Sequence, residues 1–153
     1  DVARLDFPLL RTKQDFDTGA LPDSLRDAQA AIGRAEHLVL IYPLWLGTMP
    51  ALLKAFLEQV LRPGFATSKV SGGRSWQRLL TGRSARIVIT MGMPAFIYRW
   101  YFRAHSLKSL ERNILGFCGI GPIRESLIGL VDANLAKRAK WLGKMQALGR
   151  RGD

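Results

Sequence analysis

Two short segments of this 153-residue chain combine the residue types that suit a flat, apolar ligand. Pro43 to Met49 and Thr90 to Tyr98 both contain glycine, aromatic residues and methionine, and neither is rich in titratable groups. Aromatic and aliphatic side chains can cover the faces of a ring system, while backbone N–H groups in tight glycine turns can donate to its polar edge. An isoalloxazine ring is one ligand of this kind. The alternative is that the same side chains simply close the end of a hydrophobic core.

The elements around these two segments predict that both lie at one edge of a parallel sheet. Leu38 to Tyr42 and Ile87 to Met91 are continuous apolar runs rich in β-branched residues, which is typical of strands buried on both faces. A helix with a 3.6-residue apolar period is predicted from Pro50 to Leu61, before Pro63-Gly64 ends it. Strand, loop and helix in this order favour a three-layer α/β/α fold, in which ligands bind outside the carboxyl ends of the strands.

The rest of the chain continues the alternation of helices and strands, which indicates a single domain over residues 1–153. We expect the end of a strand within Asp1 to Leu10. A long polar excursion from Phe65 to Gly82 is a candidate lid or dimer contact. The remaining expectations are a final strand at 123–130 and helices at 22–36, 96–102, 107–117 and 133–148, the last with Asp132 as its N-cap.

The composition is that of a soluble protein with an unusual positive charge. No apolar stretch reaches the roughly 20 residues of a membrane-spanning helix, and the first residues lack the order of a signal peptide, so we expect a cytoplasmic protein. Cys118 is the single cysteine, and the spacing of cysteine and histidine predicts no metal site. The formal net charge is +11, with many cations on the last predicted helix. This charge indicates either a solvated surface or weak contact with an anionic ligand or membrane, and we expect no nucleic-acid partner.

Three segments carry motifs that are more specific than composition. The longest reads YPLWLGTMPALLKAF from Tyr42 to Phe56 and is followed by PGFA from Pro63. The second reads TMG at 90–92 with Tyr98 downstream, and the third reads GFCGI at 116–120. Together these segments resemble the flavodoxin-like NAD(P)H:quinone oxidoreductases, the family of DT-diaphorase and the bacterial quinone reductases. The resemblance covers nearly all of the chain, although Met91 stands where the family's second flavin loop usually has a polar residue.

This resemblance implies a flavodoxin-like parallel sheet with a site for FMN or FAD and with NAD(P)H as co-substrate. It implies that the flavin ring is held by Pro43, Leu44, Trp45, Leu46 and Gly47, with Thr90, Met91 and Gly92 on its pyrimidine side. Tyr98 is implied to stand near the nicotinamide and the quinone. His105 lies in the region where some family members carry a histidine that assists hydride transfer. The implied reaction passes a hydride from NAD(P)H to the flavin and then two electrons to a quinone, in a homodimer.

The resemblance also implies a sheet that is incomplete at the N-terminus. Family members begin with a strand and a loop that grips the flavin phosphate. In the family's strand order, 2-1-3-4-5, that strand would lie between Val2 to Phe7 and Leu38 to Tyr42. One alternative function is a regulatory or ancillary subunit without turnover, since family relatives accompany potassium-efflux systems. Another is an anion-binding or membrane-surface module that uses the basic final helix.

Overall fold

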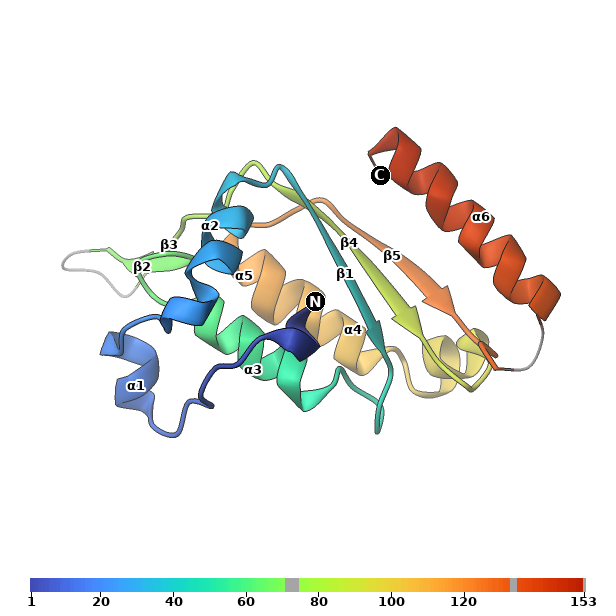
Figure 1. The fold of residues 1–153 in the computed structure, drawn as a ribbon, viewed down its shortest axis with the longest axis horizontal. Coiled ribbons are helices and arrows are strands. Elements are labelled where there is room, and N and C mark those ends of the chain that lie inside the picture. The colour runs from blue at the N-terminus through green and yellow to red at the C-terminus, as the bar shows by residue number, and fades with distance from the viewer. Residues whose placement is uncertain (71–74, 133–134, 153) are drawn as a thin grey trace.

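Three parallel strands form the sheet at the centre of this computed structural model, which describes residues 1–70, 75–132 and 135–152 (Figure 1). Strand β1 (His37–Pro43) pairs with β4 (Ser84–Thr90), and β4 pairs with β5 (Ile123–Ile128), so the strand order is β1-β4-β5. The connections between these strands contain helices, as parallel pairing requires. The predicted α/β class with a parallel sheet is therefore confirmed.

Helices lie on both sides of this sheet. Helix α3 (Ala51–Val60) lies on one side together with the consecutive helical turns α4 (His105–Ser109), η4 (Leu110–Leu115) and α5 (Gly116–Cys118). Helix α6 (Leu135–Arg151) lies beyond β5 on the other side (Figure 1). This arrangement confirms the three-layer prediction. Within the described residues, no helix is both long and apolar enough to cross a membrane.

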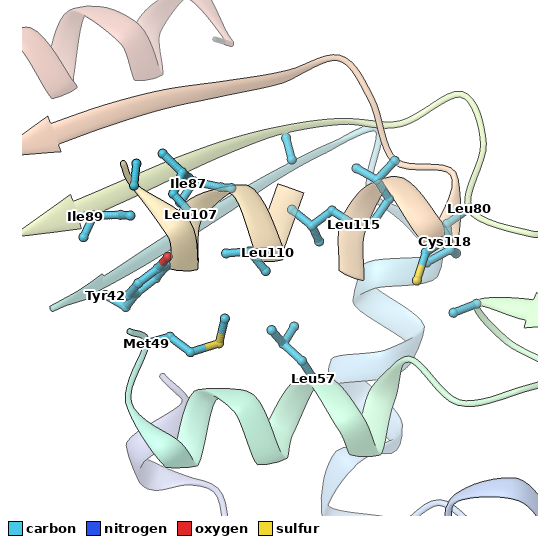
Figure 2. Close-up of a cluster of buried hydrophobic side chains, with 14 of the residues drawn as sticks. Tyr42, Met49, Leu57, Leu80, Ile87, Ile89, Leu107, Leu110, Leu115 and Cys118 are labelled. Carbon is cyan, nitrogen blue, oxygen red and sulfur yellow. The ribbon is translucent and has the colours of Figure 1, made fainter. Parts of the chain in front are cut away.

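The core lies between the sheet and α3. Alternate residues of each strand point to the same face, so every second residue of a strand can contribute to it. Figure 2 shows Tyr42, Ile87 and Ile89 of the strands facing Leu57 of α3, with leucines of the α4–α5 segment beside them. The side chains of Ile87 and Ile89 are fully buried, as is that of Leu110. The packing of this face against the helices holds β1 and β4 in place, and with them the loops that follow the two strands.

The first ten residues do not form the predicted strand. Val2–Arg4 form a single 3-10 turn, η1, whose Asp1 carboxylate accepts the Ala3 N–H (3.1 Å), and residues 5–10 have no regular structure. The prediction was wrong because an apolar, extended-style composition forms a strand only where a neighbouring strand can supply hydrogen bonds, and none lies beside this segment in the described residues.

Two polar side chains at the end of α3 hold this N-terminal segment instead. Gln59 Nε2 donates to the Pro8 carbonyl (2.6 Å), and the Arg62 guanidinium donates to the carbonyls of Asp15 (2.8 Å) and Gly19 (2.5 Å). Both side chains are buried, and they also hydrogen bond to each other. Asp15 belongs to helix α1 (Lys13–Thr18), so the pair attaches a whole helix to the core.

The remaining elements match the predictions with smaller differences. Helix α2 (Arg26–Arg34), preceded by the 3-10 turn η2 (Asp23–Leu25), occupies the helix predicted at 22–36. The aromatic helix is a π-helical turn, η3 (Ile97–Tyr101). The polar excursion contains an antiparallel hairpin of β2 (Thr67–Lys69) and β3 (Trp76–Arg78). Gly72 and Gly73 in that excursion, and the predicted helix start at Ala133, lie outside the described residues.

Strand β1 is an edge of the sheet in the described residues. Its outer edge is unpaired there, and Val39 and Ile41, on the face away from α3, are 53% and 69% exposed. A largely apolar cavity of about 610 Å³ runs along β1 and reaches Leu53 and Phe56 of α3. Isolated apolar residues are common on surfaces, but an open strand edge with apolar neighbours is a surface that can pair with another strand.

The single cysteine is part of the core. Cys118 is 3% exposed, and burial raises the pKa of its thiol to about 11. Because only the thiolate reacts, the reactive fraction at pH 8 falls on the order of a hundredfold below that of a free cysteine. We expect the native protein to react with a disulfide reagent such as DTNB at least about a hundredfold more slowly than the urea-unfolded protein. Rapid stoichiometric labelling of the folded protein would contradict this burial.

Candidate active site

The carboxyl ends of β1 and β4 bring the two predicted loops together. Pro43 lies opposite Thr90 in the parallel register, and the Leu44 N–H continues the ladder by donating to the Thr90 carbonyl (2.8 Å). The segments that follow β1 and β4 then leave the sheet at the same edge, where ligands of open α/β sheets bind. Of the residues implied by the resemblance, Pro43, Leu44 and Thr90 are half-buried at this edge.

A tight turn presents the next residues to solvent. Trp45 and Thr48 exchange two backbone hydrogen bonds (2.9 and 3.0 Å), and the two residues between them have positive φ angles, 47° at Leu46 and 80° at Gly47. Glycine adopts this conformation readily, but leucine does so only under strain, and such strain is concentrated at functional sites. The Leu46 side chain is fully exposed and that of Trp45 is 62% exposed. Within the described residues, the N–H groups of Leu46 and Gly47 donate to no protein acceptor.

A pocket of about 460 Å³ lies between this turn and helix α4. This volume is within the range of about 300–1,000 Å³ that is usual for small-molecule sites. Its apolar wall comes from the first loop and includes Trp45, Leu46, Met49 and Pro50, and its polar wall comes from α4 with Ser106 and Ser109. The two serines are site residues that the sequence did not indicate, because nothing in their spacing distinguishes them from an exposed helix face.

The second loop is held close to the end of β5. The Met91 N–H donates to the Ile128 carbonyl (2.9 Å), and the Leu130 N–H donates to the Met93 carbonyl (3.2 Å). Gly129 lies between these contacts, where a Cβ atom would come within 2.7 Å of the Met93 carbonyl oxygen and closer still to the Ala95 nitrogen. Only glycine fits there without moving the loop. Sequence reasoning missed this residue, because its role depends on a contact between distant segments.

Met91 and Gly92, both implied as flavin-contacting, differ in position. Met91 is 3% exposed and is part of the hydrophobic core. Gly92 is exposed, and a Cβ atom at this position would meet no atom within 4 Å. The space over Gly92 is therefore open to a flat ligand, whereas Met91 faces the protein interior.

The two residues implied as catalytic, Tyr98 and His105, differ in their exposure to solvent. Tyr98 is 2% exposed, and its hydroxyl is hydrogen bonded to Ser106 Oγ (2.7 Å) while accepting the Leu107 N–H (3.1 Å). It thereby fixes the start of α4 and the serine that lines the pocket. His105 is exposed at the first position of α4, directly before Ser106. The structure thus places Tyr98 behind Ser106 of the pocket wall, whereas neither Tyr98 nor His105 lines the pocket itself.

The site contains few groups that could move protons. Lys54 is the titratable residue that lines the pocket, and its ammonium group is paired with Glu58. Burial, reinforced by Tyr98, raises the pKa of the nearby Tyr42 phenol, which therefore stays protonated. Within the described residues, no three histidine, cysteine, aspartate or glutamate side chains are grouped to hold a metal ion. A pocket of this kind binds and orients a ligand, and the ligand must supply most of the reactivity.

A parallel sheet with helices on both faces, and a pocket beside the loop that follows its first strand, is typical of α/β proteins of the doubly wound class. The chain belongs to the family described as having the flavodoxin-like fold, whose model matches residues 1–148. This match confirms the family to which the sequence motifs pointed.

Some of the proteins that this chain resembles are named as oxidoreductases. An uncharacterized NAD(P)H oxidoreductase of Haemophilus influenzae is 32% identical over 144 residues, which cover 90% of this chain and 70% of that protein. The crystal structure of Smu.1420 from Streptococcus mutans UA159 has a TM-score of 0.78 at 27% identity, covering 97% of this chain and 78% of that one. The NAD(P)H:quinone oxidoreductase from Methanothermobacter marburgensis has a TM-score of 0.78 at 22% identity, covering 100% and 80%, which shows the shared fold. The Haemophilus relative supports an oxidoreductase enzyme.

Proposed function

We propose that this protein is a flavin-dependent NAD(P)H oxidoreductase that reduces a quinone-like acceptor. The observation that carries the proposal is the pocket beside the loop that follows β1, with its exposed Trp45–Leu46 turn. The open backbone at Gly92, in the loop that follows β4, lies at the same edge of the sheet. The names of the relatives support the reaction class. When bound, FMN or FAD would accept a hydride from NAD(P)H and return two electrons to the acceptor.

The residues present fit the ring of a flavin. Trp45 and Leu46 offer apolar surface to its face, and the unpaired N–H groups of Leu46 and Gly47 are donors for the polar atoms at its edge. The protein's own part is to orient this ring and to exclude water from one of its faces. Ser106, fixed by Tyr98, closes the far wall, and His105 is the candidate for holding a proton beside the acceptor.

The proposal includes a homodimer. Trp76 of β3 and Phe117 of α5 are 42% and 44% exposed, and the centroids of their rings are 6.1 Å apart. The hairpin and α5 therefore share an apolar surface suited to contact with a second copy. Sedimentation equilibrium of the purified protein tests this part separately from the chemistry.

Titration with flavin tests the proposal most directly. We expect the purified protein to bind FMN or FAD with a change in flavin absorbance. We expect that absorbance to bleach on addition of NADPH or NADH under nitrogen and to return with a soluble quinone. A colourless protein that also fails to bind added FMN and FAD would overturn the flavin assignment and favour the alternative of a subunit without turnover.

A substitution at Gly92 locates the ring within the site. Gly92→Ala adds a methyl group in open space, so the unliganded protein should keep its stability. If the ring lies against this backbone, the methyl group should weaken flavin binding about tenfold or more, as one misplaced carbon does in an apolar pocket. Gly143→Ala on α6, whose added Cβ also meets no atom, is the matched control and should bind normally. Equal flavin affinity in both variants would show that the ring does not contact Gly92.

A further inference from the structure

We propose that the aromatic surface of η3 and the basic groove beside it form a docking surface for a bilayer that contains anionic lipids. The aromatic surface is formed by Phe96, Trp100, Tyr101 and Phe102. This inference goes beyond the proposed reaction and does not depend on a bound flavin.

The aromatic surface consists of large side chains that the fold leaves outside. Phe96, Trp100, Tyr101 and Phe102 are 64%, 76%, 80% and 46% exposed, while Tyr98 in the same turn is buried. The chain turns away after them through two residues with positive φ, 53° at Arg103 and 48° at Ala104. Tryptophan and tyrosine are enriched where proteins meet the headgroup region of a membrane, because one end of each ring is apolar and the other is polar.

A groove of about 1050 Å³ adjoins this surface, and Trp100 lines it. Its cations come from β4, β5, η3, the turn after η3 and the α4–η4 segment. They are Arg86, Arg99, Arg103, Lys108, Arg112 and Arg124. Two carboxylates, Glu111 and Glu125, oppose them, and Glu125 is paired with Arg99. The groove therefore carries a clear excess of positive charge next to the exposed ring of Trp100.

One of these cations is buried with unused hydrogen-bonding capacity. Arg86 is 7% exposed, its Nη1 donates to Ser126 Oγ (3.1 Å), and its Nε has no hydrogen-bond partner among the residues that the structure describes. A buried donor without an acceptor is costly, so it marks a place where an anionic oxygen would be stabilised. Lipid phosphate is an acceptor of this chemistry, and guanidinium groups bind phosphate through paired donors.

The adjoining aromatic rings and cations favour a membrane over other occupants. A soluble anion would use the groove but would leave the four aromatic side chains in water. A second copy would bring the same cations to the contact, in a chain whose net charge is +11. An anionic bilayer accepts both features at once, because rings enter the interfacial layer while arginine and lysine side chains remain at the phosphates.

Sedimentation of the purified full chain with vesicles tests the proposal. We expect binding to vesicles of phosphatidylcholine with one quarter phosphatidylglycerol, little binding to phosphatidylcholine alone, and loss of binding in high salt. No binding to the anionic vesicles would overturn the proposal. Equal binding to uncharged vesicles would also overturn it, because the basic groove would then contribute nothing.

Paired variants locate the surface. Arg103→Gln with Arg112→Gln, and separately Trp100→Ser with Tyr101→Ser, alter exposed side chains and should each weaken vesicle binding about tenfold or more. The matched control, Arg138→Gln with Lys140→Gln, removes the same charge from exposed positions on α6 and should have little effect. An equal loss in the α6 control would overturn the proposal in favour of the C-terminal helix.

Two further measurements separate the competing occupants. Quenching of tryptophan fluorescence by brominated lipids should fall in Trp100→Phe, because this ring is expected to enter the interfacial layer. If Trp100→Phe shows unchanged quenching, the aromatic surface does not meet the bilayer.

If the aromatic variants abolish self-association and leave vesicle binding intact, the surface is an interface between copies. If inorganic phosphate competes away vesicle binding in the wild type while the aromatic variants bind vesicles normally, the groove is a site for soluble anions. Either of these last results overturns the proposal.

Discussion

Gly129→Ala is expected to weaken flavin binding at least tenfold and to lower the free energy of unfolding by about 1–3 kcal/mol, the usual cost of overpacking. The added Cβ would come within 2.7 Å of the Met93 carbonyl oxygen and still closer to the Ala95 nitrogen. Both contacts are with backbone, so no side chain can rotate out of the way. The loop that begins at Met91 must therefore move, and with it Gly92 at the edge of the proposed site.

Urea unfolding and FMN titration of the same preparation measure both effects of Gly129→Ala. Gly143→Ala is again the control, since its Cβ meets no atom and alanine replaces glycine within helix α6. That variant should be equally or slightly more stable than the wild type. An unchanged urea midpoint with unchanged FMN affinity in Gly129→Ala would show that the end of β5 does not set the position of the loop.

Arg62→Met should lower the free energy of unfolding by about 3 kcal/mol, because it removes the donors to Asp15 and Gly19 and leaves the buried Gln59 side-chain oxygen without its hydrogen bond. The methionine can fill the space of the side-chain stem but cannot donate to Asp15 or Gly19. The urea midpoint should fall by about 1–2 M for a domain of this size. Because the lost bonds hold α1, trypsin should also cleave after Lys13 faster than in the wild type.

Two comparisons isolate the hydrogen bonds from the loss of charge. Arg62→Lys keeps the charge but loses the planar fork that binds Gln59 and the Asp15 and Gly19 carbonyls at once, so it should retain little of the stability. Arg138→Met makes the same chemical change at an exposed position of α6 and should have little effect. If Arg62→Lys is as stable as the wild type, charge rather than hydrogen-bond geometry holds the N-terminal segment.

The sequence predicted the elements whose local pattern and tertiary role agree. The apolar run at Leu38–Tyr42 became β1, and the periodic residues after Pro50 became α3, each within a residue or two of the expected ends. Buried parallel strands and amphipathic helices have distinct periods, so their patterns can be recognised without a structure. The motif from Tyr42 to Phe56 then placed the first site loop at the carboxyl end of the sheet.

What the sequence missed depends on contacts between distant residues. Nothing local distinguishes Arg62 from the exposed arginines, or Gly129 from glycines that meet no neighbour. The strand expected within Asp1 to Leu10 failed for the same reason, since a strand requires a partner. Tyr98 was assigned by its position in a motif, whereas its burial and its bond to Ser106 could be known only from the structure.

The open edge of β1 has a consequence for the colloidal behaviour of the protein. Val39 and Ile41 lie exposed beside backbone groups that pair with no strand among the described residues, and such groups can act as a template for intermolecular sheet growth. The net charge of +11 keeps copies apart at low ionic strength. At physiological salt the screening length is only about 8 Å, so this protection weakens. Concentrated solutions should therefore remain clear longest in dilute buffer.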